Sequence, residues 1–219
     1  DRIVAGGESH LGLVEAGVGL IPSGGGTKEL LLRVLAPLRH LATAAAARAG
    51  GDRETPAKPF AEADPLPFVQ SVFEGIALGK VSGSSLEARE LGYLRDEDVV
   101  VLNRDRQLTA ARDLVLHLEA SGYRPPRRRP IPVPGRQVRA ALELAIYGMQ
   151  SSGLASEHDA LIARRLAYVL SGGDLPQGTL VDEQHLLDLE REAFLSLAGE
   201  AKTQERMRHM LETGKPLRN

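Results

Sequence analysis

The chain has 219 residues, of which 42% are hydrophobic and 4% aromatic, and 29 Asp and Glu residues nearly balance 27 Lys and Arg residues. The absence of cysteine excludes disulfides, thiolate nucleophiles and Cys-based zinc or iron–sulfur sites. A formal charge of −2 supplies no general attraction for nucleic acid, and no apolar run approaches the roughly 20 residues of a membrane span. We therefore expect a cytoplasmic globular protein of one or two domains.

The first 22 residues are predicted to be extended or loop-like, with a short apolar strand at residues 3–5. The glycines of residues 17–22 disfavour a helix. Because the chain begins at Asp1 without an initiator Met, we expect a piece of a longer protein. Residues 23–27 then open a helix that runs to about residue 50, since apolar residues recur at three- and four-residue steps. They are Leu30, Leu31, Val34, Leu35, Leu38 and Leu41.

Residues 50–65 are polar and rich in Pro and Gly, which predicts a mobile connection. Asp64 and Pro65 mark the next helix start, as an N-cap candidate followed by proline at the first helical position. The apolar stripe of that helix is Val69, Val72, Phe73, Ile76 and Ala77. A brief strand is predicted over residues 99–102.

Further helices are predicted over residues 84–92, 104–121, 136–152, 157–171, 182–198 and 200–213. Residues 124–134 are rich in proline, which predicts an extended, polyproline-like strap. Ser156 and Asp159 have the spacing of a capping box, and Gly172 stops the helix that they begin. More than half of the chain is therefore expected to be helical.

Two features of the opening segment admit a chemical interpretation. Glu15 follows an apolar segment in a glycine-lined loop, where a carboxylate can act as a general acid or base, although spacing alone favours a surface carboxylate. Residues 24–28 suggest a phosphate loop, because N–H groups at a helix start bind anions. They lack the spacing of a P-loop or of a dinucleotide fingerprint. We therefore favour the interpretation that these glycines allow the start of a helix to lie close to neighbouring backbone.

Three other groups of residues are interpreted structurally. Residues 156–159 contain the residue types of a hydrolytic triad, but triad members converge from separated places, so we predict capping instead. Residues 127–129 are arginines that could bind RNA or phosphate, yet no aromatic residue interleaves with them, which favours a solvated strap. The remaining histidines, His10, His40, His117, His185 and His209, have no ligand spacing, and no metal site is expected.

Residues 12–27, GLVEAGVGLIPSGGGT, resemble the signature of the crotonase (enoyl-CoA hydratase/isomerase) family. In that family a catalytic Glu is followed at fixed spacing by a Gly and then by a Gly-rich turn into a helix. The positions in register are Glu15, Gly19, Pro22, Gly25, Gly26 and Thr27, with Ser23 where the family commonly has Gly. Residues 1–5 and 80–94 are similar to a strand and a helix of the same fold.

Residues 190–197, 204–207 and 214–219 resemble the carboxyl end of bacterial two-part 3-hydroxyacyl-CoA dehydrogenases, which carry a Rossmann region first and a crotonase region last. The resemblance implies that Asn219 is the natural carboxyl terminus and that Asp1 is an internal residue. It implies a mainly α fragment that is the C-terminal part of an α/β crotonase-like fold with a helical extension. Residues 1–103 would be the crotonase-like part, and residues 104–219 the helical region with its strap at 124–134.

The function implied by this resemblance lies in fatty-acid β-oxidation. The parent would hydrate trans-2-enoyl-CoA to 3-hydroxyacyl-CoA and oxidise that product with NAD in a missing N-terminal region. By position, Glu15 would protonate the α-carbon, and Gly19, Pro22 and Gly25 would bind the substrate. The family's other glutamate and its oxyanion-hole amides would precede Asp1, so the fragment alone is expected to be inactive.

The resemblance leaves the acyl chain length and the choice between hydratase and isomerase open. No cofactor is expected within the fragment itself. Its expected partners are an acyl-CoA thioester and either a second copy of the chain or the dehydrogenase region. The alternative is a non-catalytic helical module for docking or oligomerisation, built from residues 100–219. A pocket beside Glu15 would favour the enzyme, and a filled surface there would favour the module.

Overall fold

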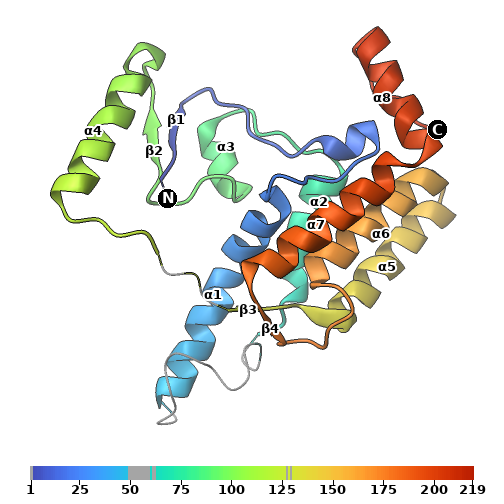
Figure 1. The fold of residues 1–219 in the computed structure, drawn as a ribbon, viewed down its shortest axis with the longest axis horizontal. Helices are drawn as coiled ribbons and strands as arrows, with labels where there is room; N and C mark the ends of the chain where they lie inside the picture. Colours follow the sequence, from blue (N-terminus) through green and yellow to red (C-terminus); the bar gives the residue numbers. More distant parts are fainter. Residues whose placement is uncertain (1, 49–59, 61–62, 127, 129) are drawn as a thin grey trace. The chain divides into compact units, whose positions relative to one another are not determined.

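The computed structural model describes residues 2–48, 60, 63–126, 128 and 130–219. The chain divides into two compact units, which we describe separately. The small unit comprises Asp1–Gly12 and Lys80–Arg129, and the large unit comprises Leu13–Gly79 and Pro130–Asn219. Helices predominate in the described chain (Figure 1), and none of them combines the length and the apolar character needed to cross a bilayer.

The small unit is built around two short parallel strands. β1, Val4–Gly6, pairs with β2, Val99–Val101, so that Val4 lies opposite Val99. The helix α3, Ser85–Glu90, begins at Ser84, whose side chain accepts a hydrogen bond from the N–H of Glu87. The core of the small unit consists of Ala5, Ala88 and Leu94, with Ile3, Leu11, Tyr93 and Val100 packed against them.

A buried carboxylate fastens the start of β1. Asp98 accepts hydrogen bonds from the N–H of Ile3 at 2.9 Å and from the N–H of Arg95 at 2.8 Å, and it pairs with the Arg95 guanidinium. Burial raises the pKa of Asp98, but the hydrogen bonds and charge of Arg95 and the N–H of Ile3 outweigh it and leave this pKa below its ordinary value. The ionised carboxylate therefore stabilises this turn.

The last part of the small unit is the turn η2, Arg104–Arg106, followed by the helix α4, Gln107–Ala120. The Gln107 side chain donates to the carbonyl of Val4 at 2.9 Å and so attaches α4 to β1. None of the residues of α4 is buried.

The central helix of the large unit is α6, Glu157–Ser171. It packs against α5, Gly135–Ser151, and α7, Glu183–Ala198, and also against α1, Gly26–Arg48, and α2, Leu66–Ala77 (Figure 1). Contact with several helices explains why α6 is apolar on more than one side. Its buried residues are His158, Ala160, Ile162, Leu166, Ala167, Val169, Leu170 and Ser171.

Both ends of α6 agree with the prediction from the sequence. The Asp159 N–H donates to the Ser156 hydroxyl at 3.1 Å, and the Ser156 N–H donates to the Asp159 carboxylate at 3.0 Å, which confirms the capping box. The helix ends at Gly172, which has φ +81°. A Cβ there would lie 2.3 Å from the side chain of Val133, so this position requires glycine.

The other predicted helices of the large unit are also present. α2 begins beside Asp64, whose carboxylate accepts from the N–H of Leu66 at 2.9 Å. The predicted connection over residues 50–65 lies largely outside the described residues. The described part of the strap is not helical, and it leads into β3, Ile131–Pro132, which pairs antiparallel with β4, Leu180–Val181. The sequence did not predict β4.

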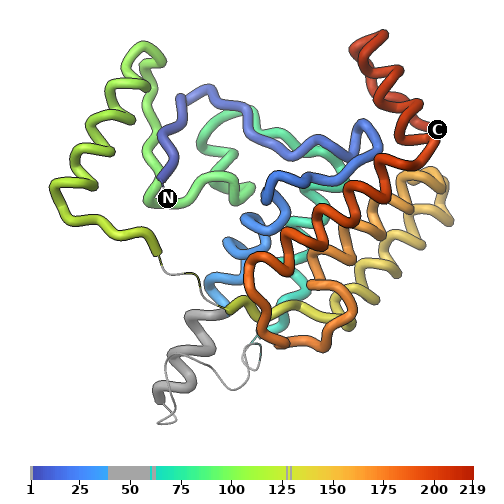
Figure 2. The backbone as a smooth tube through the Cα atoms, viewed as in Figure 1, coloured from blue at the N-terminus to red at the C-terminus, as the bar shows by residue number. Residues whose placement is uncertain are grey.

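Two further elements complete the large unit. The turn η1, Glu15–Val18, lies against the first turn of α8, Ala201–Thr213, and the backbone trace of Figure 2 shows how these segments from opposite ends of the sequence meet.

The expectation of the C-terminal part of an α/β crotonase-like fold is wrong. The described residues form eight helices and only four strands of two or three residues, arranged as two separate pairs rather than as the sheet of an α/β fold. The glycine-rich opening that suggested this fold forms a 3-10 turn and a helix start instead. The domain boundary after residue 103 stays a prediction.

Candidate functional site

Glu15 lies at the start of η1, and the backbone of this turn is tightly fixed. The N–H of Gly19 donates to the carbonyl of Ala16 at 3.1 Å, and the N–H of Leu20 donates to the carbonyl of Glu15 at 3.0 Å. Gly19 ends the turn with φ +88°, a conformation that other residues rarely adopt. The turn therefore determines the direction in which the Glu15 side chain leaves the backbone.

The Glu15 side chain has an unusual environment. The residue is only partly buried, but its Oε2 atom exposes less than 1 Å² and has no hydrogen-bond partner among the described residues. A buried polar atom without a partner costs free energy, and it calls for an explanation when it occurs in a native fold. A carboxyl group held in this way can serve in proton transfer.

Thr203 of α8 packs directly against the turn that carries Glu15. Its side chain is fully buried, and its hydroxyl donates to the carbonyl of Gly19 at 2.9 Å. A Cβ on Gly19 would lie 2.7 Å from the Thr203 hydroxyl oxygen and 2.9 Å from its Cα. Gly19 is thus required both for its φ angle and for the close approach of α8.

His158 completes a chain of hydrogen bonds with Thr203. Its Nε2 lies 2.9 Å from the Thr203 hydroxyl oxygen. Because the hydroxyl hydrogen is donated to Gly19, the oxygen accepts, so Nε2 of His158 carries the hydrogen. Burial lowers the pKa of His158, and the positive charges of Arg206 and Lys202 lower it further. The imidazole is therefore neutral near pH 7.

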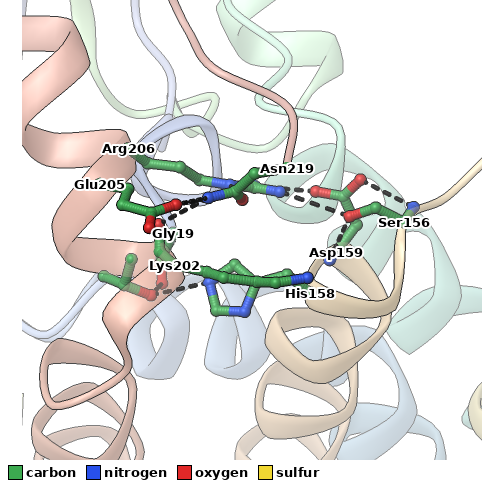
Figure 3. A network of polar contacts seen from close by, with 9 residues as sticks. Gly19, Ser156, His158, Asp159, Lys202, Glu205, Arg206 and Asn219 are labelled. Atoms are coloured by element: carbon green, nitrogen blue, oxygen red, sulfur yellow. Dashed lines mark hydrogen bonds and ion pairs between the residues drawn. The ribbon is translucent and has the colours of Figure 1, made fainter.

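Arg206 has the largest fully buried side chain among the described residues, and its guanidinium joins three parts of the large unit (Figure 3). It donates to Asp159 at 2.8 Å, to the side chain of Asn219 at 2.9 Å and to the Ser156 hydroxyl at 3.4 Å. Burial raises the pKa of Asp159, but hydrogen bonds from the Ser156 backbone and from Arg206 outweigh it and leave this pKa below its ordinary value. The start of α6 is therefore tied to α8.

Asn219 is held from its other side as well. Its side-chain amide donates to the carbonyl of Lys202 at 3.1 Å and to the Glu205 carboxylate at 3.0 Å (Figure 3). Asn219 thus connects the Arg206 guanidinium to the first turns of α8.

The N-terminus of α1 already holds an anion, the carboxylate of Glu190 from α7. The N–H of Gly25 donates to Glu190 Oε2 at 2.9 Å, and the N–H of Lys28 donates to Oε1 at 2.8 Å. The positive end of a helix stabilises such a charge. Burial nevertheless raises the pKa of Glu190 above its ordinary value, although these two N–H groups act in the opposite direction. A carboxylate of the chain itself thus fills the position that a phosphate loop would offer to a phosphate.

The lysine of the same segment is also paired. The Lys28 ammonium donates to Glu29 at 2.6 Å and to Glu183 at 2.9 Å. Burial lowers the pKa of Lys28, but hydrogen bonds to the two carboxylates outweigh it and leave this pKa above its ordinary value. These contacts support the interpretation of residues 24–28 as a closely packed helix start.

The four residues predicted to form a site are placed as follows. Glu15 and Gly19 lie on one turn, and Pro22 is buried in the segment that leads from this turn to α1. Gly25 has φ +88°. Its N–H donates to Glu190, and its carbonyl accepts a hydrogen bond from the N–H of Glu29 at 2.9 Å. Their catalytic and substrate-binding roles stay predictions.

The hydrolytic-triad interpretation of residues 156–159 is resolved by geometry. Ser156 and Asp159 form a helix cap, and His158 binds Thr203 rather than either of them. The described His, Asp and Glu side chains nowhere gather in a group of three that could hold a metal ion.

Sequence reasoning missed three of the residues that organise this region: Glu190, Thr203 and Arg206. A signal was present for Glu190, because it lies within the buried stripe of α7 between Leu189 and Ala193. A charged residue in an apolar stripe is seldom buried without a partner. Thr203 and Arg206 are the buried residues of α8, at the spacing of one helical turn.

Comparison with known proteins identifies one strong similarity. The chain is 48% identical over 218 residues to a probable 3-hydroxyacyl-CoA dehydrogenase of Bacillus subtilis (strain 168). The alignment covers 100% of this chain and 25% of that protein, so the chain spans about a quarter of the length of this relative. No family model matches the chain, and no solved structure matches it.

These findings bear differently on the two resemblances seen in the sequence. The similarity to a 3-hydroxyacyl-CoA dehydrogenase is confirmed across the whole chain. Membership of the crotonase family receives no support from the comparisons.

The contacts of Glu190 predict the effect of its replacement. In Glu190→Gln one of the two N–H groups loses its acceptor and faces an NH₂ group, so we expect the free energy of unfolding to fall by about 1–3 kcal/mol. In Glu190→Ala both N–H groups lose their acceptor, and the loss should be larger. Urea unfolding of the 219-residue chain, followed by circular dichroism, measures both changes.

Glu192→Gln is the matched control, because Glu192 is an exposed carboxylate on the same helix. It should change the free energy of unfolding by no more than about 0.5 kcal/mol. Equal stability of Glu190→Gln and Glu192→Gln would contradict the role assigned to the buried carboxylate.

Buried His158 predicts a loss of stability in mild acid. Its folded-state pKa lies below the ordinary value of 6.5, so the unfolded chain binds the proton first and stability falls as the pH drops below 6.5. Burial is the main cause of this lowered pKa; Arg206 and Lys202 lower it further, whereas Glu200 and Asp159 act in the opposite direction. The slope is at most about 1.4 kcal/mol per pH unit for one site. Urea midpoints at pH 7.5 and 5.5 measure the loss.

His158→Gln removes the titrating group and keeps a side-chain donor, so its stability should change less between these two pH values. The matched control is His117→Gln at an exposed position of α4, which should keep the pH dependence of the wild type. The assignment to His158 is wrong when His158→Gln and the wild type lose stability equally.

Proposed function

We propose that the chain is part of a 3-hydroxyacyl-CoA dehydrogenase of fatty-acid β-oxidation, an oxidoreductase that oxidises a 3-hydroxyacyl-CoA with NAD. The observation that carries this proposal is the 48% identity that extends over the whole chain. Because the similarity extends over the whole chain, we infer that this part of the two proteins shares one fold and one position within the larger protein. A cytoplasmic location belongs to the same proposal.

NAD does not fit the glycine-rich helix start of this chain. A dinucleotide would place its pyrophosphate on free N–H groups at a helix N-terminus. At α1 the N–H groups of Gly25 and Lys28 already donate to the Glu190 carboxylate, and the Lys28 ammonium is paired with Glu29 and Glu183. The proposal therefore assigns NAD to residues outside this chain, and no step of the oxidation is derived from the residues described above.

A second candidate function, hydration of trans-2-enoyl-CoA, is favoured by one specific observation. The Oε2 atom of Glu15 is buried and has no hydrogen-bond partner among the described residues. In this candidate Glu15 protonates the α-carbon while water adds to the β-carbon with the help of another carboxylate. Substrate contacts at Gly19, Pro22 and Gly25 belong to the same proposal, although the N–H groups of both glycines already have partners within the chain.

Docking or oligomerisation is the remaining part of the proposal. Several large apolar side chains are exposed in the described units, among them Leu108 and Val115 of α4 and Leu144 and Tyr147 of α5. Exposed apolar side chains along a helix are typical of surfaces that contact another protein region. They support contact with the dehydrogenase region or with a second copy.

The dehydrogenase proposal predicts an activity of the whole protein that carries this chain. The purified protein should reduce NAD when 3-hydroxyacyl-CoA is added, and the formation of NADH is measured by absorbance. A panel of 3-hydroxyacyl-CoA substrates of increasing chain length identifies the preferred one, and free 3-hydroxy acids serve as the control. Absence of NADH formation with every thioester would reject the proposal.

The hydration candidate predicts the effect of Glu15→Gln in the same protein. A glutamine cannot deliver a proton, so kcat for the hydration of crotonyl-CoA should fall by about 10²–10⁴-fold. Dehydrogenation of 3-hydroxybutyryl-CoA should change little, which makes it an internal control for folding. Glu192→Gln is the matched surface variant. Hydration at the wild-type rate by Glu15→Gln would exclude Glu15 as the acid.

A further inference from the structure

The turn that carries Glu15 is held by a residue from the far end of the sequence. Thr203 lies 184 positions after Gly19, and its hydroxyl donates to the Gly19 carbonyl at 2.9 Å. The same hydroxyl oxygen lies 2.9 Å from Nε2 of His158. Both Thr203 and His158 are buried, with exposed fractions of 0% and 3%. A hydrogen bond in such a place is protected from competition with water.

We propose that Thr203, oriented by His158, is a positioning residue that holds Glu15 for proton transfer to an enoyl-CoA. This inference rests on the hydration proposed above for Glu15. In this proposal Thr203 acts on Glu15 through its hydrogen bond to Gly19 and does not contact the substrate. His158 fixes the hydroxyl rotor, because its N–H occupies the acceptor side of the oxygen and leaves the hydrogen to point at Gly19.

The connection from Gly19 to Glu15 runs through the backbone of η1. The N–H of Gly19 binds the carbonyl of Ala16, and the N–H of Leu20, the next residue, binds the carbonyl of Glu15. A shift of Gly19 therefore moves the Cα of Glu15. No hydrogen bond among the described residues restrains Glu15 Oε2, so the position of this side chain follows its backbone and the atoms packed around it.

The hydroxyl group is the feature of Thr203 that this role requires. The hydroxyl donates one hydrogen bond to the Gly19 carbonyl and accepts another from His158. It also lies so close to Gly19 that a Cβ on that residue would be 2.7 Å from the hydroxyl oxygen. Serine provides the same hydroxyl on a smaller side chain. Valine provides nearly the same shape without the hydroxyl, and it leaves the Gly19 carbonyl and the His158 N–H without partners. The two variants therefore separate positioning from packing.

The test compares Thr203→Val and Thr203→Ser in the whole protein, with crotonyl-CoA as the substrate. A displacement of about 1 Å can cost about 10²-fold, so kcat for hydration should fall by about 10–100-fold in Thr203→Val while KM changes by less than about threefold. Thr203→Ser should keep kcat within about threefold of the wild type, because the hydroxyl is restored. Oxidation of 3-hydroxybutyryl-CoA by each variant reports whether the protein is folded.

Hydrogen–deuterium exchange of the segment 15–22 supplies a readout that does not depend on activity. The N–H groups of Gly19 and Leu20 should exchange faster in Thr203→Val than in Thr203→Ser. Equal exchange in the two variants, or equal loss of kcat, would overturn the positioning role.

The two proposals fail in different ways. A wild-type hydration rate in Glu15→Gln would reject the role of Glu15 and with it this inference. A wild-type rate in Thr203→Val, together with a large loss in Glu15→Gln, would reject the positioning role of Thr203 alone.

Discussion

The buried carboxylate of Glu190 determines how the glycine-rich opening of the large unit is folded. A helix leaves its first N–H groups without internal partners, and at α1 two of them donate to this single carboxylate. The arrangement combines two opposing effects, because the positive end of the helix favours the charge whereas burial disfavours it. Burial has the larger effect and raises the pKa of Glu190 above its ordinary value. The ionised carboxylate therefore depends on the N–H groups of Gly25 and Lys28 for its stability.

A similar contact between a late side chain and an early glycine is found at η1, the turn that precedes α1. Gly19 and Gly25 both have positive φ angles, and each receives a polar side chain from the last helices: Thr203 binds the carbonyl of Gly19, and Glu190 binds the N–H of Gly25. Glycine gives these side chains room to reach the backbone. The shape of the segment between η1 and α1 is thus determined by α7 and α8, which follow it by more than 150 residues.

Local signals were sufficient to predict the helices, whereas contacts between distant residues were not predictable. The capping box of Ser156 and Asp159 and the stop at Gly172 lie within the sequence that they delimit, and α6 was predicted with its observed bounds. β4 has only two residues, and its strand character arises from pairing with β3 about 50 residues earlier. The crotonase-like fold was wrongly inferred because a motif of glycines and a proline encodes local turns, which different folds share.

In the segment from Glu15 to Thr27, two buried side-chain oxygens, Glu15 Oε2 and Thr27 Oγ1, have no hydrogen-bond partner among the described residues. The backbone groups of Gly19 and Gly25 that a ligand might have used are engaged within the chain, so their glycines are explained by the approach of α8 and α7. Among the buried carboxylate oxygens of the described residues, Oε2 of Glu15 is the one without a hydrogen-bond partner. The chain provides hydrogen-bond donors for the buried carboxylates of Glu190, Asp159 and Asp98. The unpaired oxygen is the observation that supports the role in proton transfer proposed above for Glu15.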